Sequence, residues 1–551
     1  MAFEDLLAEA EAKGRFRALQ ILTLAVPLVL IGGHFLLENL TAFVPKHRCW
    51  VHELDNTSAS LSISEDLNLT SLLKVFIPLD SDGRPESCRR FSAPQWQALL
   101  PNVTTQNFSQ LEMEPCADGW VYDQSIITSS IVTEWDLVCD SQTLKTLSQS
   151  IFFAGILVGH VLWGCLSDRF GRKWILLLNY FLLAVFSTGA AFAQSFSIYC
   201  SFHSLLGISL AGIVTGSGSI GFEWSSSHYR DLITVIFSMS ASLGHVLLGI
   251  VAYNINQWRQ LQLVMSVPFF VFSLTAWWLP ESARWLIVHN KLDDALKEFR
   301  KVAKINGVKD YSLTIEALRS TMEKESDAAQ THYTVLDAVH FPILRTRVLC
   351  LSISGFSFLL IFYGMALDIQ NLGQNIQRLQ IVFGVSTLVS KLVALFFMNC
   401  FGRQRVIVAS LFPAVLLIFG YGFLSQEILR TVLAMLGISC IVICMCNYYV
   451  YSFELLPTIV RNTCRGLIFT VERIGTLLAP LINLLMIYSP VLPKVIFATL
   501  AITTCLLTFF FLPETKNQPV PDTIQEMECG HSRKEASPRN QGDTKVKISQ
   551  F

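Results

Sequence analysis

Long apolar runs separated by polar segments follow one another along almost the whole chain. A helix needs about 20 apolar residues to cross the hydrocarbon core of a bilayer, and twelve runs approach or exceed that length. The pattern predicts helices over residues 19–40, 146–166, 174–194, 198–222, 232–253 and 261–279, and over residues 348–367, 376–398, 405–424, 431–453, 465–488 and 493–512. We therefore expect an all-α membrane protein whose first helix is not a cleaved signal peptide.

The polar segments divide this pattern into two six-helix halves. We expect a cytoplasmic N-terminus, an N-terminal half with a large loop at residues 41–143, a cytoplasmic linker, a C-terminal half and a cytoplasmic tail, over residues 1–18, 19–279, 280–347, 348–512 and 513–551. In the linker Leu296, Phe299 and Val302 recur at helical spacing, which predicts short amphipathic helices. Only 15% of the 551 residues are charged, whereas a soluble chain is nearer a quarter.

Several classes of protein are disfavoured by what the chain carries. A net charge of -1 argues against nucleic acid as a partner. The segment GSGSIG at Gly216 to Gly221 matches a dinucleotide fingerprint, but it lies inside an apolar run with no strand before it, so close helix packing is the better interpretation. We find no phosphate-binding GxxxxGK[ST] loop, no metal-ligand spacing and no catalytic constellation. An enzyme, an ATP-driven pump and a cofactor are therefore not expected.

The second and third runs are joined by GCLSDRFGRK, Gly164 to Lys173. A turn between two membrane-length helices must lie at the bilayer surface, and its basic residues mark that side as cytoplasmic. We expect Asp168 to pair with a base or face a helix N-terminus, Gly164 to allow close helix contact and Gly171 to allow a tight turn. A merely solvated charged turn is the alternative.

The C-terminal half contains a weaker version of this turn. CFGRQR at Cys400 to Arg405 lies between the eighth and ninth runs and lacks the aspartate. The same loop at the same place in two halves predicts a parallel repeat of six helices.

The long loop after the first helix has the features of an extracellular segment. Glycosylation sequons begin at Asn56, Asn68, Asn102 and Asn107. Four cysteines suggest two disulfides, with three pairings possible, at Cys49, Cys88, Cys116 and Cys139. We therefore predict a glycosylated, disulfide-bonded outer loop.

Short motifs across the chain resemble one transporter family. They are HRCW, DGWVYD, IVTEWDLVCD, PESARWL, FELLPTIVR, LPET and PDTIQ, which begin at residues 47, 118, 131, 280, 453, 512 and 521. Together with the turn motif they are similar to the organic anion transporters of solute carrier family 22, within the major facilitator superfamily. The ends MAFEDLL and ISQF are most like the branch of the urate exchanger and its steroid-conjugate relatives.

The resemblance implies a twelve-helix major facilitator fold and alternating access to a site near the midplane. It implies a multispecific carrier of urate, steroid sulfates and aromatic or aliphatic carboxylates in the plasma membrane. Such carriers often exchange their substrate for an intracellular anion such as a dicarboxylate. An organic cation or zwitterion carrier, and a transport-deficient scaffold protein, are the alternatives.

Two cations inside predicted helices indicate an anion site. Lys391 and Arg473 lie seven and eight residues from the predicted helix ends, or about 10–12 Å deep. An intramembrane cation costs at least ~2.5 kcal/mol and normally faces a cavity or a partner. In organic cation relatives the second position typically carries an acid, so Arg473 implies the anion branch. A structural ion pair is the alternative, with Glu472 as the obvious partner.

Aromatic and polar side chains in the helices complete the predicted site. Rings can stack on an aromatic anion while the cations bind its charged group. Tyr449 and Tyr451 accompany Tyr448, and for each tyrosine a plain core role is equally compatible with the sequence. The candidate substrate contacts besides the two cations are Phe362, Tyr363, Tyr448, His34, Asn39 and His245.

A second set of charged residues is predicted to control conformation. Where relatives have an arginine in a pattern like YCxxRFLxG, this chain reads YCSFHSLLG, with His203. An imidazole can lose the charge that an arginine keeps, which affects gating or proton coupling. We assign gating to Asp168, Arg169, Arg172, Glu223, Arg230, Glu454, Arg461 and His203.

The chain ends in Ser549-Gln550-Phe551. This hydroxyl-x-apolar pattern is one that a PDZ groove captures by β-augmentation and carboxylate binding. The predicted partners are therefore the lipid bilayer, a small organic anion, a counter-anion and a PDZ-domain protein.

Overall fold

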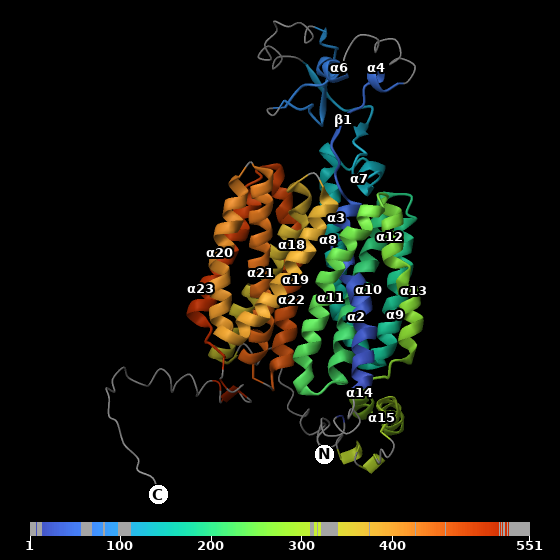
Figure 1. The fold of residues 1–551 in the computed structure, drawn as a ribbon, viewed down its shortest axis with the longest axis vertical. Helices are drawn as coiled ribbons and strands as arrows, with labels where there is room; N and C mark the ends of the chain where they lie inside the picture. The colour runs from blue at the N-terminus through green and yellow to red at the C-terminus, as the bar shows by residue number, and fades with distance from the viewer. Residues whose placement is uncertain are drawn as a thin grey trace, which may run out of the picture.

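The computed structural model describes residues 7, 14–56, 69–80, 83–96, 112–308, 313–316, 318–320, 340–373, 375–424, 426–457, 459–516, 518, 521, 524–525 and 527. Long helices lie side by side in a bundle (Figure 1). A small region with the β-strands lies beyond one end of the bundle, which we call the loop end. Two short helices, α14 and α15, lie beyond the opposite end, which we call the linker end.

The helices of the bundle that precede residue 280 form the N-terminal group. Its first member is α2 (Arg15–Leu36), continued by α3 (Glu38–Thr41). The others are α8 (Gln142–Phe170), α9 (Arg172–Ala191), α10 (Phe196–Glu223), α11 (Ser227–Asn254), α12 (Trp258–Ser266), α13 (Pro268–Thr275) and η4 (Ala276–Trp278).

The helices after residue 341 form the C-terminal group. Its members are α18 (Pro342–Leu367), η5 (Asp368–Asn371), α19 (Ile376–Phe401), α20 (Arg403–Phe423), α21 (Glu427–Leu455), α22 (Arg461–Leu484), η6 (Leu485–Ile487) and α23 (Leu492–Phe511). Within the described residues, twelve spans are long and apolar enough to cross a membrane, which confirms the predicted number. Several helices begin or end a few residues beyond the apolar runs, because polar residues at the membrane surface remain helical.

Each group packs mainly within itself. In the N-terminal group α10 lies against α8 and α9, and α2 lies against α11; in the C-terminal group α18 packs on α22 and α20 on α21. Glycines allow this close approach: a Cβ on Gly155 would lie 2.3 Å from the Ser204 carbonyl oxygen. The GSGSIG segment is helical and Gly216 faces Leu176 of α9, so the packing interpretation is confirmed.

Two helix pairs make the most extensive contacts between the groups. They are α11 with α19, and α8 with α22. Figure 1 shows this boundary between the green α11 and the yellow-orange helices of the C-terminal group. Any side chain near the middle of these four helices can therefore take part in a site between the groups.

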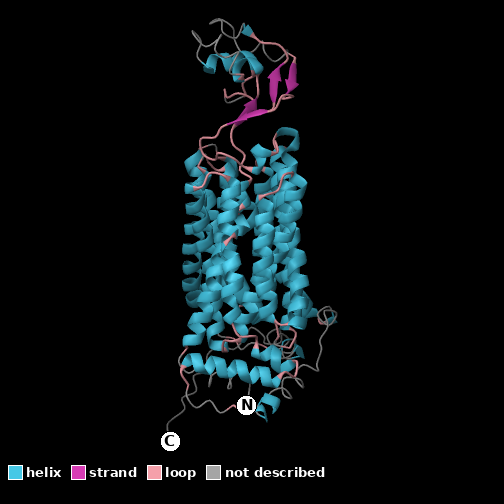
Figure 2. Cartoon of the chain, turned by 90° about the vertical axis from the view of Figure 1, so that its right-hand side faces the viewer, coloured by secondary structure: helices cyan, strands magenta, loops and turns pink. Residues whose placement is uncertain are grey.

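The long loop is a folded region, not merely a polar segment. Strands β1 (His47–Cys49) and β4 (Trp120–Tyr122) pair antiparallel, as do β2 (Arg89–Phe91) and β3 (Met113–Pro115). Figure 2 shows these strands in magenta beyond the bundle. Short helices complete the region: α4 (His52–Asp55), α6 (Leu69–Phe76), α7 (Ile131–Glu134) and η3 (Cys139–Ser141).

Two disulfides hold this region together, as predicted. They join Cys49 to Cys116 and Cys88 to Cys139, which selects one of the three possible pairings. Cys49 and Cys116 lie in or beside paired strands, so this bridge ties β1 to the end of β3. Of the sequon residues, Asn56 follows α4, whereas the other three, Asn68, Asn102 and Asn107, lie outside the described residues.

The linker contains the predicted amphipathic helix. α14 (Ala283–Val288) leads into α15 (Leu292–Asn306), whose Phe299 and Val302 are fully buried. The ring of Phe299 lies 5.5 Å from that of Trp224, at the linker end of the N-terminal group. Asn306 Oδ1 accepts a hydrogen bond of 2.9 Å from the Phe16 N–H, so α15 also fixes the start of α2.

The turn between α8 and α9 is shorter than predicted. α8 continues to Phe170 and α9 begins at Arg172, so Gly171 alone separates them, with φ 101°. A side chain at this φ would be strained, which explains the glycine. The close helix contact predicted for Gly164 is wrong, because a Cβ at that position would have no neighbour within 4 Å.

Candidate functional site

Lys391 and Arg473 lie deeper in the bundle than the sequence suggested. α19 ends at Phe401 and α22 begins at Arg461, which places the two cations ten and twelve residues from the linker end of their helices. At about 1.5 Å per residue, these positions are about 15 and 18 Å deep. Both cations therefore lie near the middle of the bundle, at similar height.

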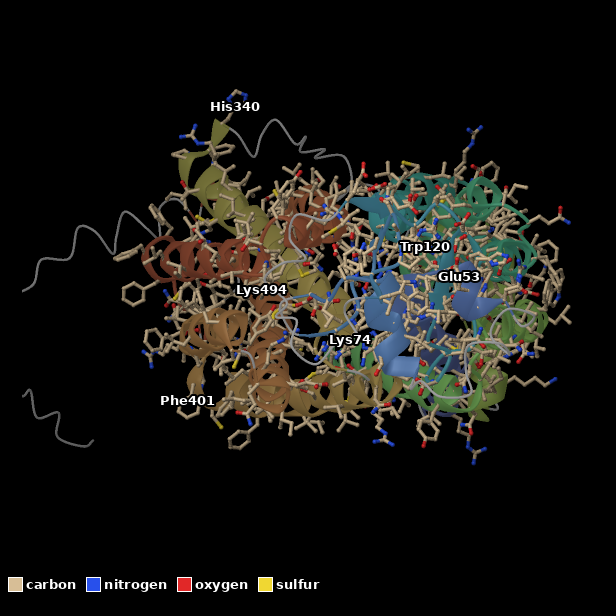
Figure 3. The ribbon with its side chains drawn as sticks, turned by 90° about the horizontal axis from the view of Figure 1, so that it is seen from above. Glu53, Lys74, Trp120, His340, Phe401 and Lys494 are labelled. Atoms are coloured by element: carbon tan, nitrogen blue, oxygen red, sulfur yellow. A yellow bond between two sulfur atoms is a disulfide. The ribbon has the colours of Figure 1, made fainter. Side chains whose placement is uncertain are left out.

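Other buried cations of the C-terminal group have carboxylate partners. Arg465 lies 2.8 Å from Glu472, and Lys494 lies 3.2 Å from Asp368, with every one of these side chains at most 12% exposed. Seen from the loop end in Figure 3, Lys494 lies among the helices of the C-terminal group. These two pairs are structural ion pairs in the sense that each buried charge is compensated.

Lys391 and Arg473 differ from these pairs. Within the part of the chain that the structure describes, neither has a carboxylate oxygen within 4.0 Å. Lys391 Nζ donates a hydrogen bond of 2.5 Å to the Ser238 carbonyl of α11, across the boundary between the groups. The Arg473 guanidinium lies 4.4 Å from the centre of the Phe469 ring. Two partly buried positive charges thus remain without a carboxylate partner at one level of the bundle.

Aromatic rings surround Arg473 from both groups. Phe469 contacts the His160 ring of α8 at 4.9 Å. The Arg473 guanidinium interacts with the Tyr363 hydroxyl, and the Tyr363 ring lies 5.1 Å from Phe153 of α8. Rings of α8, α18 and α22 therefore meet beside this cation.

The predicted aromatic pair and His245 come together near the α11–α19 contact. Phe362 lies 5.9 Å from Phe383, and His245 lies 5.3 Å from the same ring. Lys391 is two helical turns further along α19 from Phe383. The structure therefore brings Phe362, Tyr363 and His245 to the boundary between the groups.

The remaining predicted contacts have separate environments. Asn39 donates a hydrogen bond of 2.7 Å to the Ala366 carbonyl and so joins the groups. His34 donates one of 3.2 Å to the Met265 carbonyl, inside the N-terminal group. The Tyr448 hydroxyl lies 2.8 Å from the Leu351 carbonyl and 2.9 Å from Glu472. Within the described part of the chain, Asn39 is the one of these three that is hydrogen-bonded to the opposite group.

Sequence reasoning missed several residues of this region. Glu472 was considered as a partner for Arg473, but its partner is Arg465, seven residues earlier on the same face of α22. Phe469 and His160 were also missed. The i, i+7 spacing of Arg465 and Glu472 was the available signal, whereas nothing in the sequence connected His160 with Phe469.

The predicted gating residues of the N-terminal group form a charge network at the linker end. Arg172 pairs with Asp168 at 2.9 Å and with Glu223 at 3.2 Å. Glu281 Oε1 accepts from the Arg172 N–H at 2.9 Å and from the Lys173 N–H at 3.1 Å. The carboxylate therefore caps the first turn of α9, where free N–H groups favour a negative charge.

The C-terminal group repeats this arrangement. Arg403 pairs with Glu454 at 2.9 Å, and its N–H donates to Glu514 at 2.9 Å. In each group the arginine follows a positive-φ glycine, and its ion-pair partner is 51 residues later. A Cβ on Gly402 would collide with Glu514, as one on Gly171 would with Glu281. We call each set, Arg172–Glu223–Glu281 and Arg403–Glu454–Glu514, a clasp.

The two capping carboxylates of the clasps titrate differently. Burial raises the pKa of Glu281 above its ordinary value, and the N–H groups of Ser282, Lys173 and Arg172 only partly oppose that effect. Burial also acts to raise the pKa of Glu514, but backbone N–H groups, among them that of Arg403, hold it below its ordinary value. The clasp of the C-terminal group therefore binds the charged carboxylate more strongly.

Three other predicted gating residues lie at the linker-end termini of their helices. Arg169 lies beside Phe170, 5.6 Å from the ring centre. The Arg461 guanidinium donates to the Leu456 carbonyl at 3.2 Å, where α22 begins. Arg230 lies in the first turn of α11, and its carbonyl accepts from Thr234.

His203 has a partner that the sequence did not reveal. Its Nε2 lies 3.1 Å from Glu38 Oε2, and both side chains are buried. The other oxygen of Glu38 accepts from Ser148 of α8. Lys145, one turn before Ser148 on α8, interacts electrostatically with Glu38 and donates a hydrogen bond of 2.7 Å to Gln370 of η5. This cluster connects α2–α3, α8 and α10 with the C-terminal group.

One set of side chains in the described residues has the spacing of a metal site. His47, Cys88 and Cys139 place their potential ligand atoms within 4.8 Å of one another. Cys88 and Cys139 are joined in a disulfide, so neither offers a thiolate. The arrangement therefore does not fit a metal ion.

The comparisons with known proteins agree with this architecture. The model of the sugar (and other) transporter family matches residues 97–527. The steroid transmembrane transporter SLC22A24 of Microcebus murinus is 44% identical over 100% of both chains. The chain belongs to solute carrier family 22. It is therefore a membrane transporter of the major facilitator superfamily.

Other relatives in solute carrier family 22 are similarly close. Solute carrier family 22 member 11 of Homo sapiens is 43% identical over 97% of each chain, and member 12 of Homo sapiens is 42% identical over 100% of each. Among solved structures, the proton:xylose symporter XylE bound to 6-bromo-6-deoxy-D-glucose gives a TM-score of 0.58 at 16% identity, covering 93% of this chain and 99% of that one. The last likeness establishes the fold alone.

Proposed function

We propose that this solute carrier family 22 protein transports small organic anions by alternating access. The observation that carries the proposal is that no carboxylate oxygen of the described residues lies within 4.0 Å of Lys391 or Arg473, while Arg465 and Lys494 are paired. A buried charge without a counter-charge is costly, and an anionic substrate would compensate both cations at once. We take the substrate's carboxylate or sulfate to bind them directly.

The proposed substrates are urate, steroid sulfates and aromatic or aliphatic carboxylates. Tyr363, Phe362 and Phe469 offer ring faces beside the cations, which suits a flat or apolar body. A relative that is 44% identical is named a steroid transmembrane transporter, which supports the steroid conjugates. Asn39, His245, Tyr448 and His34 remain proposed contacts, of which His34 and Tyr448 would act through their neighbours.

The proposed transport cycle rocks the two groups about this site. Hydrogen bonds from Lys145 to Gln370, from Asn39 to Ala366 and from Gln377 to the Ala252 carbonyl join the groups toward the loop end, and they are among the contacts that break when that end opens. The two clasps lie at the linker end and would control opening there, together with Arg230 and Arg461. The His203–Glu38 pair lies toward the loop end and would act on opening at that end. We propose exchange against an intracellular anion such as a dicarboxylate.

The proposed location is the plasma membrane, with both termini and the linker end cytoplasmic. The loop end would then be extracellular, where disulfides persist and sequons are glycosylated. We keep the five segments predicted from the sequence, from the N-terminus to the C-terminal tail, with the boundaries given above. A PDZ-domain protein is the proposed partner of the C-terminal tail. An organic cation carrier is disfavoured because Glu472, the acid nearest Arg473 in sequence, already pairs with Arg465.

Uptake into cells tests the proposal. Cells expressing the chain receive labelled urate, estrone sulfate or p-aminohippurate, with a quaternary ammonium compound as the cation control. We expect saturable uptake of at least one anion, stimulated by preloading with glutarate. Surface protein that takes up only the cation, or nothing in the panel, would contradict it.

A further inference from the structure

Glu472 is a carboxylate buried inside the bundle beside the proposed anion site. Its side chain is 0% exposed, and its Oε1 lies 2.8 Å from Arg465 and 2.9 Å from the Tyr448 hydroxyl. Its Oε2 has no hydrogen-bond partner among the described residues. Gly355 of α18 makes room for it, since a Cβ there would lie 2.5 Å from Glu472 Cγ. A buried acid that uses half of its acceptors is not explained by packing alone.

Arg465, the partner of Glu472, lies among aromatic rings of α21. Its guanidinium is 5.3 Å from the centre of Tyr449 and 5.7 Å from those of Tyr448 and Phe453. Tyr449 interacts electrostatically with Arg465, Glu472 and Arg473 together. The Arg465–Glu472 pair is therefore a neighbour of Arg473, separated from it by one ring.

The pair determines how many positive charges the site presents. With Glu472 ionised, Arg465 is compensated, and Lys391 and Arg473 remain as the two uncompensated cations. Without that carboxylate the same region would carry three. Arg465 and Arg473 are eight residues apart on α22, or about 12 Å along the helix axis. At that distance and an effective dielectric constant of about 20, adding one unit charge changes the affinity for a monovalent ion about tenfold.

We propose that Glu472 is a specificity-determining residue that makes the site prefer monoanions to dianions, without excluding a dicarboxylate from exchange. By cancelling Arg465 it leaves enough positive charge for one carboxylate or sulfate, and it repels the second charge of a dianion. The inference rests on the proposed function, because it assumes that the anion binds at Lys391 and Arg473. Glu472 acts through Arg465 and the field at the site, so it is a positioning residue and need not touch the substrate.

Two steroid conjugates with the same ring system test the inference. Estrone sulfate carries one negative charge, and estradiol-3,17-disulfate carries two. The measured quantity is the ratio of the inhibition constant of the disulfate to the KM of estrone sulfate, in cells expressing wild type, E472Q, R465M or R465M/E472Q. This ratio is independent of the amount of protein at the surface.

We expect E472Q to improve disulfate binding about tenfold more than estrone sulfate binding. The reason is that the second sulfate is attracted by Arg465, whose charge is no longer compensated. R465M should change the ratio in the opposite direction, because it releases the carboxylate. R465M/E472Q restores the net charge and should return the ratio to within about twofold of wild type.

The outcomes separate the two proposals. If wild-type protein at the surface takes up neither estrone sulfate nor any other anion of the panel, the proposed function itself is contradicted. The role of Glu472 is overturned if uptake is normal and the ratio of inhibition constant to KM is equal in all four proteins. It is also overturned if R465M/E472Q shows the same change in that ratio as E472Q. If E472Q does not reach the surface, the R465M ratio decides, and an unchanged ratio there overturns the inference.

Discussion

Removing the charge of Arg473 is the most direct perturbation of the proposed anion site. The guanidinium has no ion-pair partner among the described residues, so Arg473→Ala leaves no carboxylate stranded. Breaking a buried ion pair costs about 3–5 kcal/mol of stability, and that cost does not arise here. The variant should therefore fold and reach the surface.

The effect on transport follows from the interaction that is lost. A charge-assisted hydrogen bond contributes about 1.5–3 kcal/mol, which corresponds to an increase of about 10- to 150-fold in KM. Arg473→Lys should retain part of the affinity, because the charge stays while the bidentate geometry is lost. Arg473→Asp should abolish anion uptake, since it adds repulsion and can pair with Lys391.

The assay is initial-rate uptake of the best anion of the panel, normalised to surface protein measured by biotinylation. Arg378→Ala is the matched control: Arg378 is an exposed cation on α19, the helix of Lys391, and its removal should leave KM unchanged. If Arg473→Ala and Lys391→Ala both reach the surface with wild-type KM values for every anion, the two charges are structural. The substrate site would then have to lie elsewhere.

The two clasp carboxylates should respond differently to neutralisation. The pKa of Glu281 is raised above about 4.5 in the folded protein, so the ionised form costs stability once the pH exceeds that pKa, and Glu281→Gln should leave the melting temperature at pH 7 unchanged or higher. The pKa of Glu514 is lowered, so its ionised carboxylate stabilises the folded protein at pH 7, and this stabilisation is lost as the pH falls below about 4.5. Glu514→Gln should therefore lower the melting temperature by about 2 °C at pH 7 and by less at pH 4. Equal losses for the Glu281 and Glu514 variants would refute the assignment. His203 faces Glu38, with Lys145 nearby, so uptake should differ between pH 5.5 and 7.5 and His203→Arg should flatten the difference; identical pH profiles would mean that His203 only packs. Deleting Phe551 should abolish capture of the tail by immobilised PDZ domains, and a panel that never binds the intact tail would exclude that partner.

The pattern of the sequence was sufficient for the number and order of the membrane helices. A bilayer leaves few solutions for a chain with twelve apolar runs, because every backbone amide inside it must be hydrogen-bonded locally. The paired turns at Gly171 and Gly402 were also recognisable, since glycine is required where φ is positive. The family resemblance followed from motifs at the helix ends and in the loop, which hydrophobicity alone does not constrain.

Which charges pair with which was decided only by the tertiary structure. The sequence places Lys391 and Arg473 inside predicted helices and Arg465 and Lys494 at helix ends, and it does not show which of the four has a carboxylate partner. Asp368 and Glu472 neutralise two of them, and the helix faces and crossing points that select those two depend on packing between distant segments. The pairing of His203 with Glu38, 165 residues away, has the same origin. Periodicity reports the face of a helix that is apolar; the element that covers that face depends on the arrangement of all the other helices.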